Sequence, residues 1–542
     1  MKQPKLIVLG LDGASFNILL PLVEAGHMPG LGKVLERGVW GNLASVIPPV
    51  TAPAWASFMT GCLPGRHGVH GFECYIPGTS TKQWVDSRVI KIKKLWHWIN
   101  RGDLTTGVIN MPITYPAESL NGYLISGFLT PLNAATPCFP PEILDEVTAS
   151  VGEYIINVPV MDEKPSNPQH GRDLMKRLMA AAETRFRAME FLMAHRPVDA
   201  LICVYMLLDK WQHLFGALLD PECAHAVRGA RLTREELIAP YRQIDDFITA
   251  VTERLGDDSH LLIVSDHGFG GLKRTFFLNN WLEEQGFLRL KSGRVMRRLI
   301  QRLHTRGDDR NHPVLHGRIF REDLGDLIDW STTRAYCGDV FTQGVFVNLK
   351  GRESSGIVAP GADYDRVCEE LRSRLLDIRD GITGRPFVNT VHRTSELYPR
   401  ADLRDAPDLF VEIDEYATII SPTYLFRERG HHVRDNHEPI GYHRKQGVFI
   451  GIGPAFAPAR DVQGLRIIDM CPLILHLLGV PIPFGLDGSL PEAVLDAGWL
   501  SNHPARYDHT DISASGYDNG ATMTPEQARE IHDRLRGLGY LD

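Results

Sequence analysis

Three short apolar runs, each followed by an acidic residue, constrain the fold of this chain most strongly. The runs and their acids are residues 5–11 with Asp12, residues 198–206 with Asp209, and residues 261–264 with Asp266. Apolar runs of this length are typical of strands that are buried on both faces of a parallel sheet. The polar groups that follow such strands collect at the carboxyl edge of the sheet, which is where α/β proteins bind ligands.

Two longer segments, residues 171–195 and 233–255, have the apolar spacing of amphipathic helices. Each precedes one of the later apolar runs, so helices and strands alternate along the chain. We therefore predict an α/β fold with a central, mostly parallel sheet flanked by helices.

The pattern changes in the middle of the chain. Residues 344–348 and 408–413 have the composition of short strands, and residues 363–376 have that of a helix, so a smaller α+β lobe is predicted. The expected organisation is a core of residues 1–287 and 421–500, an inserted lobe of residues 288–420, and a C-terminal extension of residues 501–542.

The net charge argues against one class of partner. A net charge of −8 lacks the basic excess typical of nucleic-acid-binding proteins. A local exception is the segment of residues 289–310, which carries eight basic residues and two aspartates. This run predicts a solvated helix face or, alternatively, a contact surface for an anionic partner.

The sequence contains no evident membrane span or export signal. No stretch approaches about 18 consecutive apolar residues, and the N-terminal apolar run is too short for a signal peptide. The eight cysteines form no Cys-x-x-Cys pair, so neither a disulfide framework nor a thiolate zinc site is indicated. We expect a soluble, cytoplasmic protein.

A hydroxyl group follows the strand-like residues 39–45. The segment from Ala52 to Thr60 is rich in small residues and has Pro53 in what would be the first turn of a helix, where a missing N–H costs little. Thr51 is therefore expected to cap this helix, and the same position favours a bound anion.

Histidines accompany the acids. Asp209 and His213 are four residues apart, so on a helix they point the same way and can share one ion. His267 follows Asp266, and a histidine-rich stretch at 431–443 precedes the next predicted strand. At one sheet edge these groups would carry uncompensated charge and would require a cation, for which zinc or manganese is suited.

The chain resembles the alkaline phosphatase superfamily and, within it, the type I phosphodiesterase/nucleotide pyrophosphatase branch. The motifs that carry the resemblance are Gly10-Leu-Asp12-Gly, Pro49-Val-Thr51 through Gly61, Pro64-Gly-Arg-His67-Gly, Asp209-x3-His213, Ser265-Asp-His267-Gly and Gly441-Tyr-His443-x3-Gly-Val-Phe. They occur in the family's order across most of the chain and are highly specific as a set.

The resemblance implies a two-metal site for phosphoryl transfer. The implied ligand sets are Asp12, Thr51, Asp266 and His267 for one ion, and Asp209, His213 and a later histidine for the other. The metals, expected to be zinc with manganese as the alternative, would activate Thr51 as the nucleophile. A phospho-threonine intermediate would then be hydrolysed.

Two histidines compete for the last ligand position. His443 has the spacing before Gly447 that many relatives show, and it is favoured. His437 lies nearer the position used in the nucleotide pyrophosphatases themselves and is the alternative.

The residues after Thr51 separate the branches of the superfamily. Sulfatases need a cysteine or serine at this position and an arginine where this chain has Trp55, so a sulfatase is excluded. No charged residue occurs from Thr51 to Leu63. This favours a phosphodiester or pyrophosphate bond, because a monoester has one more charge to neutralise. The candidate substrate-binding residues are Arg66, His70 and Lys210.

The expected activity is hydrolysis of a small phosphodiester or a nucleotide-like substrate. The alternative is a phosphomonoesterase, phosphomutase or phosphotransferase with the same two-metal site, and a third reading is a metal-binding adaptor without activity. The nucleotide pyrophosphatases place an asparagine shortly after the His-Gly pair, where this chain has His70, which weakens the case for a nucleotide.

Overall fold

The computed structural model describes residues 3–75, 82–158, 168–223, 232–291, 318–319, 325–399, 403–425, 432–459, 461–514 and 523–537. The chain divides into two compact units. Unit 1 contains Met1–Cys74, Gln83–Gly271 and Glu438–Tyr540, and unit 2 contains Tyr75–Lys82, Leu272–His437 and Leu541–Asp542. The predicted lobe of residues 288–420 falls within unit 2. Most of the basic run at 289–310 lies outside the described residues.

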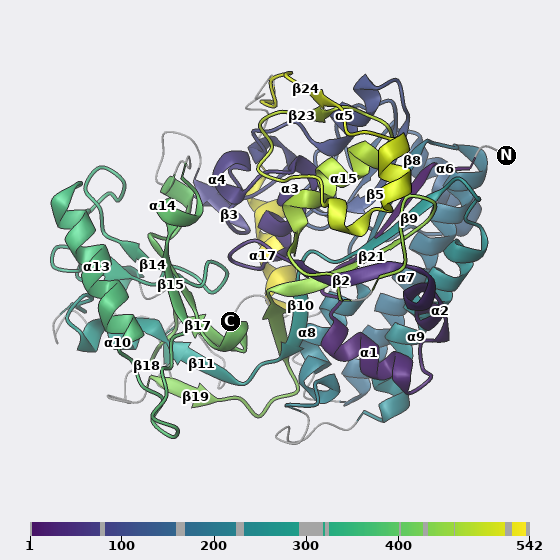
Figure 1. The fold of residues 1–542 in the computed structure, drawn as a ribbon. Coiled ribbons are helices and arrows are strands. Elements are labelled where there is room, and N and C mark those ends of the chain that lie inside the picture. The colour runs from purple at the N-terminus through teal and green to yellow at the C-terminus, as the bar shows by residue number, and fades with distance from the viewer. Residues whose placement is uncertain are drawn as a thin grey trace. The chain divides into compact units, whose positions relative to one another are not determined.

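Unit 1 is built around a nine-stranded sheet with the strand order β22-β2-β21-β9-β1-β8-β5-β6-β7 (Figure 1). The strands are β1 (Leu6–Leu11), β2 (Val39–Ala44), β5 (Thr106–Met111), β6 (Gly122–Ser126), β7 (Cys138–Phe139), β8 (Ala200–Tyr205), β9 (His260–Val264), β21 (Gln446–Ile452) and β22 (Leu465–Arg466). Neighbours are parallel except for the pairs β2/β21, β21/β9 and β6/β7. The predicted central, mostly parallel sheet is confirmed.

The three apolar runs that precede acids form the centre of this sheet. β1 lies between β8 and β9, and Leu6 is opposite Ala200 in one neighbour and His260 in the other. Every residue of these three strands is buried, because helices cover both faces of the sheet. Since the strands are parallel and in register, their carboxyl ends meet at one edge.

The helices of unit 1 pack on the two faces of the sheet (Figure 1). One face carries α1 (Phe16–Glu24), α2 (Pro29–Arg37), α7 (Pro168–His195), α8 (Leu207–Leu219) and α9 (Arg234–Glu253). Their buried side chains share a core with Ile7, Leu9 and Leu11 of β1. The other face carries α3 (Thr51–Thr60), α5 (Leu95–Arg101) and α15 (Met470–Leu477). Helices α7 and α9 confirm the two predicted amphipathic helices.

The remaining elements of unit 1 are α4 (Pro64–His67), α6 (Ile143–Val151), β10 (Gly268–Gly271), β20 (Gly441–Arg444), β23 (Ile482–Pro483), α16 (Ala497–Asn502), β24 (Tyr507–Asp508) and α17 (Pro525–Gly537). Strands β10 and β20 pair antiparallel, with Gly271 opposite Gly441. Most of unit 2 lies between them in the sequence. The chain therefore leaves unit 1 and returns to it through two paired strands.

Unit 2 is an α+β unit with a hydrophobic core of its own. Its larger sheet has the order β13-β14-β16-β15, and a smaller one has the order β17-β11-β19. Helix α13 (Ala362–Leu376) buries Val367, Cys368 and Leu371 in the same core as these strands. The strands and other helices are β11 (Arg274–Phe277), α10 (Leu278–Glu284), β12 (Arg318–Ile319), β13 (Ala335–Tyr336), β14 (Gly344–Val347), β15 (Thr390–Arg393), α14 (Thr394–Leu397), β16 (Leu409–Glu412), β17 (Thr418–Ser421), β18 (Tyr424–Leu425) and β19 (Val433–Asp435). Two short strands, β3 (Glu73–Tyr75) and β4 (Lys82–Trp84), precede them in the chain.

The helices and the cysteines were each the subject of a prediction from the sequence. Among the helices of the described ranges, none is both long enough and apolar enough to cross a bilayer. All eight cysteines are buried and carry free thiols.

Asp245 of α9 holds the start of helix α2. Its buried carboxylate accepts hydrogen bonds from Gly30 N at 2.9 Å and from Leu31 N at 2.6 Å. We expect Asp245→Ala to lower the free energy of unfolding by about 1–3 kcal/mol, because two buried N–H groups without a partner in their own helix lose their acceptor. Thermal unfolding measures this change.

Asp246→Ala provides the matched control. Asp246 is the next residue of the same helix, and its side chain is exposed. Its replacement should leave the unfolding midpoint within about 1 °C, as is usual for exposed positions. Equal losses in the two variants would contradict the role assigned to Asp245.

Candidate metal centre

Five segments of unit 1 begin or end at one edge of the central sheet. The parallel strands β1, β8 and β9 lead to Asp12, to helix α8 and to Asp266, respectively. β21 runs antiparallel to β9, so its first residues lie at this edge, directly after β20 with His443. β2 runs in the same direction as β9, and the chain continues from it to Thr51 at the start of α3.

Thr51 is the first residue of α3 and does not cap it. Val50 occupies the N-cap position, and no side chain caps the helix there, so the expected capping role is wrong. The Thr51 hydroxyl oxygen lies instead 3.3 Å from Nε2 of His267, and the side chain is fully buried. The hydroxyl at the start of this helix is thus directed toward the acids at the sheet edge.

His267 is surrounded by the first predicted set of ligands. Besides Thr51, its Nε2 lies 3.2 Å from Asp266 Oδ2 and 3.6 Å from Asp12 Oδ1. Both carboxylate oxygens are buried, and neither has a hydrogen-bond partner among the described residues. The four side chains that resemblance assigns to one ion therefore lie together.

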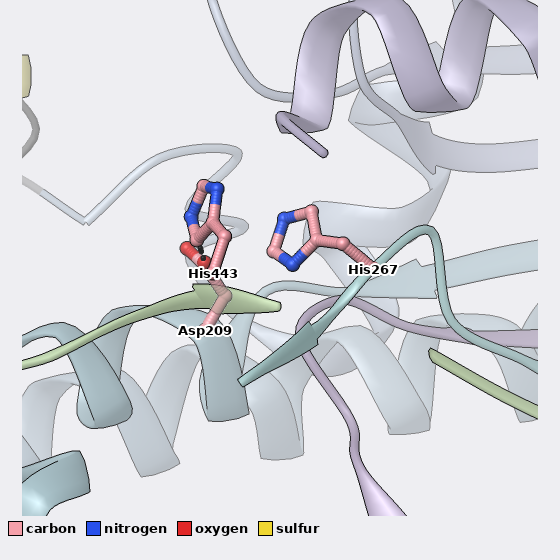
Figure 2. A group of neighbouring side chains, drawn as sticks. All are labelled: Asp209, His267 and His443. Atoms are coloured by element: carbon pink, nitrogen blue, oxygen red, sulfur yellow. Dashed lines mark ion pairs between the residues drawn. The ribbon is translucent and has the colours of Figure 1, made fainter. Parts of the chain in front are cut away.

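Asp209, His213 and His443 form a second group. Nε2 of each histidine lies 3.4 Å from Asp209 Oδ1, and the two Nε2 atoms are 3.0 Å apart. Asp209 and His213 occupy consecutive turns of α8, as their spacing predicted. Figure 2 shows the carboxylate of Asp209 beside His443, with the ring of His267 facing the same space, and the centroids of the two rings are 3.8 Å apart.

Backbone carbonyls determine which nitrogen of two imidazoles is protonated. Nδ1 of His267 is 3.0 Å from the carbonyl oxygen of Gly268, and Nδ1 of His443 is 2.9 Å from that of Pro49. A carbonyl only accepts, so each Nδ1 carries the proton and each Nε2 presents a lone pair. Burial, together with the neighbouring imidazoles, lowers the pKa of both histidines, which are therefore neutral and ready to act as ligands.

The three acids have strongly perturbed pKa values. Burial raises the pKa of Asp12 and of Asp266 well above the usual value, and repulsion from the other carboxylates raises it further. For Asp209 burial acts in the same direction, but the neighbouring imidazoles, His213 first, outweigh it and lower the pKa. Buried carboxylates at this density are costly unless a cation compensates them.

The distances in both groups fit divalent cations. A tetrahedral site with bonds of about 2.0–2.2 Å to nitrogen and oxygen places its ligand atoms about 3.3–3.6 Å apart. Four of the separations given above, from 3.3 to 3.6 Å, fall in that range, and the other two, 3.0 and 3.2 Å, are slightly shorter. The ligand atoms of Asp12, Asp266 and His267 all lie within 4.8 Å of one another, as do those of Asp209, His267 and His443, so the two groups adjoin.

Trp55 supports Asp12 from the next turn of α3. Its indole Nε1 donates to Asp12 Oδ2 at 2.7 Å, which leaves Oδ1 directed at His267. The indole packs against β1 at Gly10, where a Cβ would lie 2.6 Å from the ring. In the sequence, Trp55 served only as evidence against a sulfatase, and its contact with Asp12 was not predicted. Its position four residues after Thr51, on the same helix face, was the available signal for this contact.

The candidate substrate-binding residues have different surroundings. Arg66 pairs with Asp487 at 3.1 Å and is thereby held within unit 1. His70 is buried. Lys210 is also buried, with Nζ 5.6 Å from the centroid of the Phe128 ring.

The two candidates for the last histidine ligand also differ. His443 is buried and contacts Asp209, whereas the side chain of His437 is exposed. Of the other histidines in the stretch 431–443, His432 pairs with Glu284, and residue 431 lies outside the described residues. The geometry favours His443 as the ligand.

Comparisons with known proteins agree with this fold. A family model described as Type I phosphodiesterase / nucleotide pyrophosphatase matches residues 6–435. The structure of phosphonoacetate hydrolase from Sinorhizobium meliloti 1021 in complex with phosphonoformate is similar with a TM-score of 0.51 and 15% identity, covering 88% of this chain and 96% of the other. Murine ectonucleotide pyrophosphatase/phosphodiesterase 5 in complex with AMP gives a TM-score of 0.49 and 13% identity, covering 91% and 100%. A search of curated proteins found no match.

Trp55→Phe tests the support of the metal centre. We expect about 10- to 100-fold weaker zinc binding, because Asp12 loses the donor that orients it while the aromatic volume is largely kept. Zinc affinity is measured by competition with a chromophoric chelator.

Trp98→Phe is the control for this experiment. Trp98 is also buried, but its Nε1 has no hydrogen-bond partner among the described residues. Its replacement should leave zinc affinity unchanged. If both variants bound zinc as tightly as the unaltered protein, the role assigned to Trp55 would be wrong.

Proposed function

The chain belongs to the type I phosphodiesterase/nucleotide pyrophosphatase family of the alkaline phosphatase superfamily, whose members are phosphoryl hydrolases, and on this premise we propose that it cleaves phosphodiester or pyrophosphate bonds through a phospho-threonine intermediate on Thr51. The observation that carries the proposal is the position of the Thr51 hydroxyl, 3.3 Å from His267 Nε2 and among buried acids. An ordinary buried threonine would satisfy its hydroxyl with a backbone carbonyl instead.

The residues that would hold two divalent ions are those of the two groups described above. We propose zinc, since carboxylate and imidazole are ligands that suit it, and manganese is the alternative. When bound, the ions would supply positive charge that polarises the phosphoryl group and lowers the pKa of the threonine hydroxyl.

The chain positions its own groups for this reaction. Because Nδ1 of His267 carries the proton, the Thr51 O–H donates to Nε2, which fixes the direction of the hydroxyl. The first N–H groups of α3 have no acceptor within the helix, and they stand beside Thr51, where phosphoryl oxygens would lie. Burial of Thr51 excludes bulk water from the nucleophile until the substrate binds.

In the proposed reaction, Thr51 Oγ attacks phosphorus and the bond to the leaving alcohol or phosphate breaks. Water then attacks the phospho-threonine, and the threonine hydroxyl and the phosphate product are released. Each step exchanges one P–O bond for another, so no further reactant is needed.

A diester substrate is favoured by the charges near the nucleophile. Residues 51–63 contain no charged side chain, and Arg66, the first cation beyond them, is paired with Asp487. A monoester activity, or a phosphomutase or phosphotransferase activity, stays the alternative because Lys210 is buried next to Asp209. A small-molecule substrate and a cytoplasmic location stay predictions of the sequence.

A paired assay tests this proposal. With added zinc or manganese, the protein should hydrolyse bis-p-nitrophenyl phosphate at least about 10-fold faster than p-nitrophenyl phosphate, since residues 51–63 supply no cation beside the nucleophile. Thr51→Ala should lower kcat by about 1000-fold or more, because the nucleophile is removed while the other proposed metal ligands stay. Release of p-nitrophenolate measures both rates.

Two results would contradict the proposal. A preference for the monoester would overturn the choice of substrate class. Activity of the Thr51→Ala variant equal to that of the unaltered protein would overturn the mechanism. Ser57→Ala serves as the control, because Ser57 lies in the same helix but its hydroxyl is hydrogen-bonded to His67 at 2.9 Å.

A further inference from the structure

Three cationic side chains are buried in unit 1 without a matching set of acids. Lys210 of α8, Arg185 of α7 and Arg534 of α17 are 3%, 6% and 3% exposed. Among the described residues, neither Lys210 nor Arg185 forms an ion pair, and the ammonium group of Lys210 makes no hydrogen bond. Charges this deeply buried are ordinarily paired, because removing them from water is costly.

The loop after β6 contacts two of these cations. Lys210 Nζ lies 5.6 Å from the ring centroid of Phe128, and Arg534 Nη1 donates to the carbonyl oxygen of Thr130 at 3.1 Å. Asn157 Nδ2 donates to that same carbonyl at 2.9 Å, and Arg185 Nη2 donates to the carbonyl of residue 156, the neighbour of Asn157, at 3.1 Å. Arg185 is thus linked to the loop through the segment that contains Asn157.

Arg534 stands where an apolar residue would be expected. Ile531 and Leu535 are fully buried, and positions 531, 534 and 535 share one face of α17. Nε and Nη2 of Arg534 are buried and have no hydrogen-bond partner among the described residues. Its single ion-pair partner there, Glu530, is partly exposed, and the Glu530 Oε1 atom lies 3.3 Å from Nη1.

We propose that Lys210 and Arg534, with added charge from Arg185, form a subsite that binds a second acidic group of the substrate. The group is an oxyanion, either a carboxylate or a phosphoryl group, attached to the ester that Thr51 cleaves. This inference rests on the proposed function of Thr51. It makes the substrate an acid-bearing phosphodiester or a pyrophosphate, and a neutral alcohol diester would leave the cations unpaired.

The chemistry of the side chains suits this role. The Arg534 nitrogens without partners lie on adjacent positions of a planar guanidinium, which matches the two oxygens of a carboxylate or phosphoryl group. Lys210 supplies a point charge next to Asp209, and so links the subsite to the metal centre. The acids of that centre are assigned to metal ions, which leaves the cations for the ligand.

Three p-nitrophenyl phosphodiesters that differ in their second ester group test the subsite. Their second ester group is methyl, carboxymethyl or 2-phosphonoethyl, so that the last two carry an additional carboxylate or phosphonate. We expect kcat/KM to be about 10- to 100-fold higher for at least one acid-bearing ester, since charged hydrogen bonds contribute factors of that size. The two acidic esters distinguish a carboxylate from a phosphoryl ligand.

Arg534→Met and Lys210→Met should each lower the ratio of kcat/KM for the preferred acidic ester to that for the methyl ester by about tenfold. Either change removes a cation from the subsite that binds the acidic group. Arg529→Met is the matched control, since Arg529 lies on α17 with an exposed side chain, and it should keep the full preference. If Arg534 were only structural, its replacement would lower the unfolding midpoint and reduce hydrolysis of all three esters by the same factor.

Failure of the subsite is distinguishable from failure of the proposed function. Equal rates for the three esters, or a preference for p-nitrophenyl phosphate over all of them, would overturn the subsite. If no ester is hydrolysed, the proposed function fails, and binding to the Thr51→Ala protein decides the subsite. Carboxymethyl phosphate should then bind at least about tenfold tighter than methyl phosphate by calorimetry, with the difference lost in Thr51→Ala/Arg534→Met. Equal affinities would overturn the inference.

Discussion

The mutual repulsion of three buried carboxylates is the constraint on which unit 1 depends. Asp12, Asp209 and Asp266 follow the three adjacent parallel strands at the centre of the sheet, so the fold itself forces them together. A chain that buries three carboxylates so close together must compensate their negative charge. The nearby imidazoles provide only part of that compensation. The high pKa of Asp12 and Asp266 in the protein alone expresses this deficit of positive charge. Divalent cations would remove it, which couples the stability of the sheet edge to the chemistry proposed for it.

The surrounding structure orients the ligands before any cation binds. Two imidazoles are fixed by backbone carbonyls, and one carboxylate is fixed by the indole of Trp55. These contacts come from a strand end, a proline-rich loop and a helix. Their combined effect is that lone pairs converge on a common space, and little reorganisation is needed on binding. The helix that carries Trp55 also carries Thr51, so one rigid element positions both the nucleophile and the support of its neighbouring acid.

Much of unit 1 could be predicted from the sequence, because uninterrupted apolar runs have few alternatives to a buried parallel strand. The pairing of Asp209 with His213 followed from helical spacing. Spacing could not decide between His437 and His443, since the answer depends on where β20 pairs with β10, a contact between distant parts of the chain. Thr51 lies at the start of α3, as the sequence predicted, but its hydroxyl contacts His267 and does not cap the helix. A role for Arg534 could not be predicted for a similar reason. Its proximity to Lys210 depends on contacts between distant parts of the chain, which local sequence patterns do not indicate.

The place of β21 in the sheet has a consequence for how the chain reaches this structure. β21 pairs with β2 on one side and with β9 on the other, although both partners precede it by well over a hundred residues. Until residues 446–452 have been synthesised, β2 and β9 each present an apolar edge with unsatisfied backbone groups. Closing the sheet therefore requires contacts of very high sequence separation, which fold slowly and expose strands that can aggregate. Nascent chains that stop short of β21 are therefore expected to be clients of chaperones.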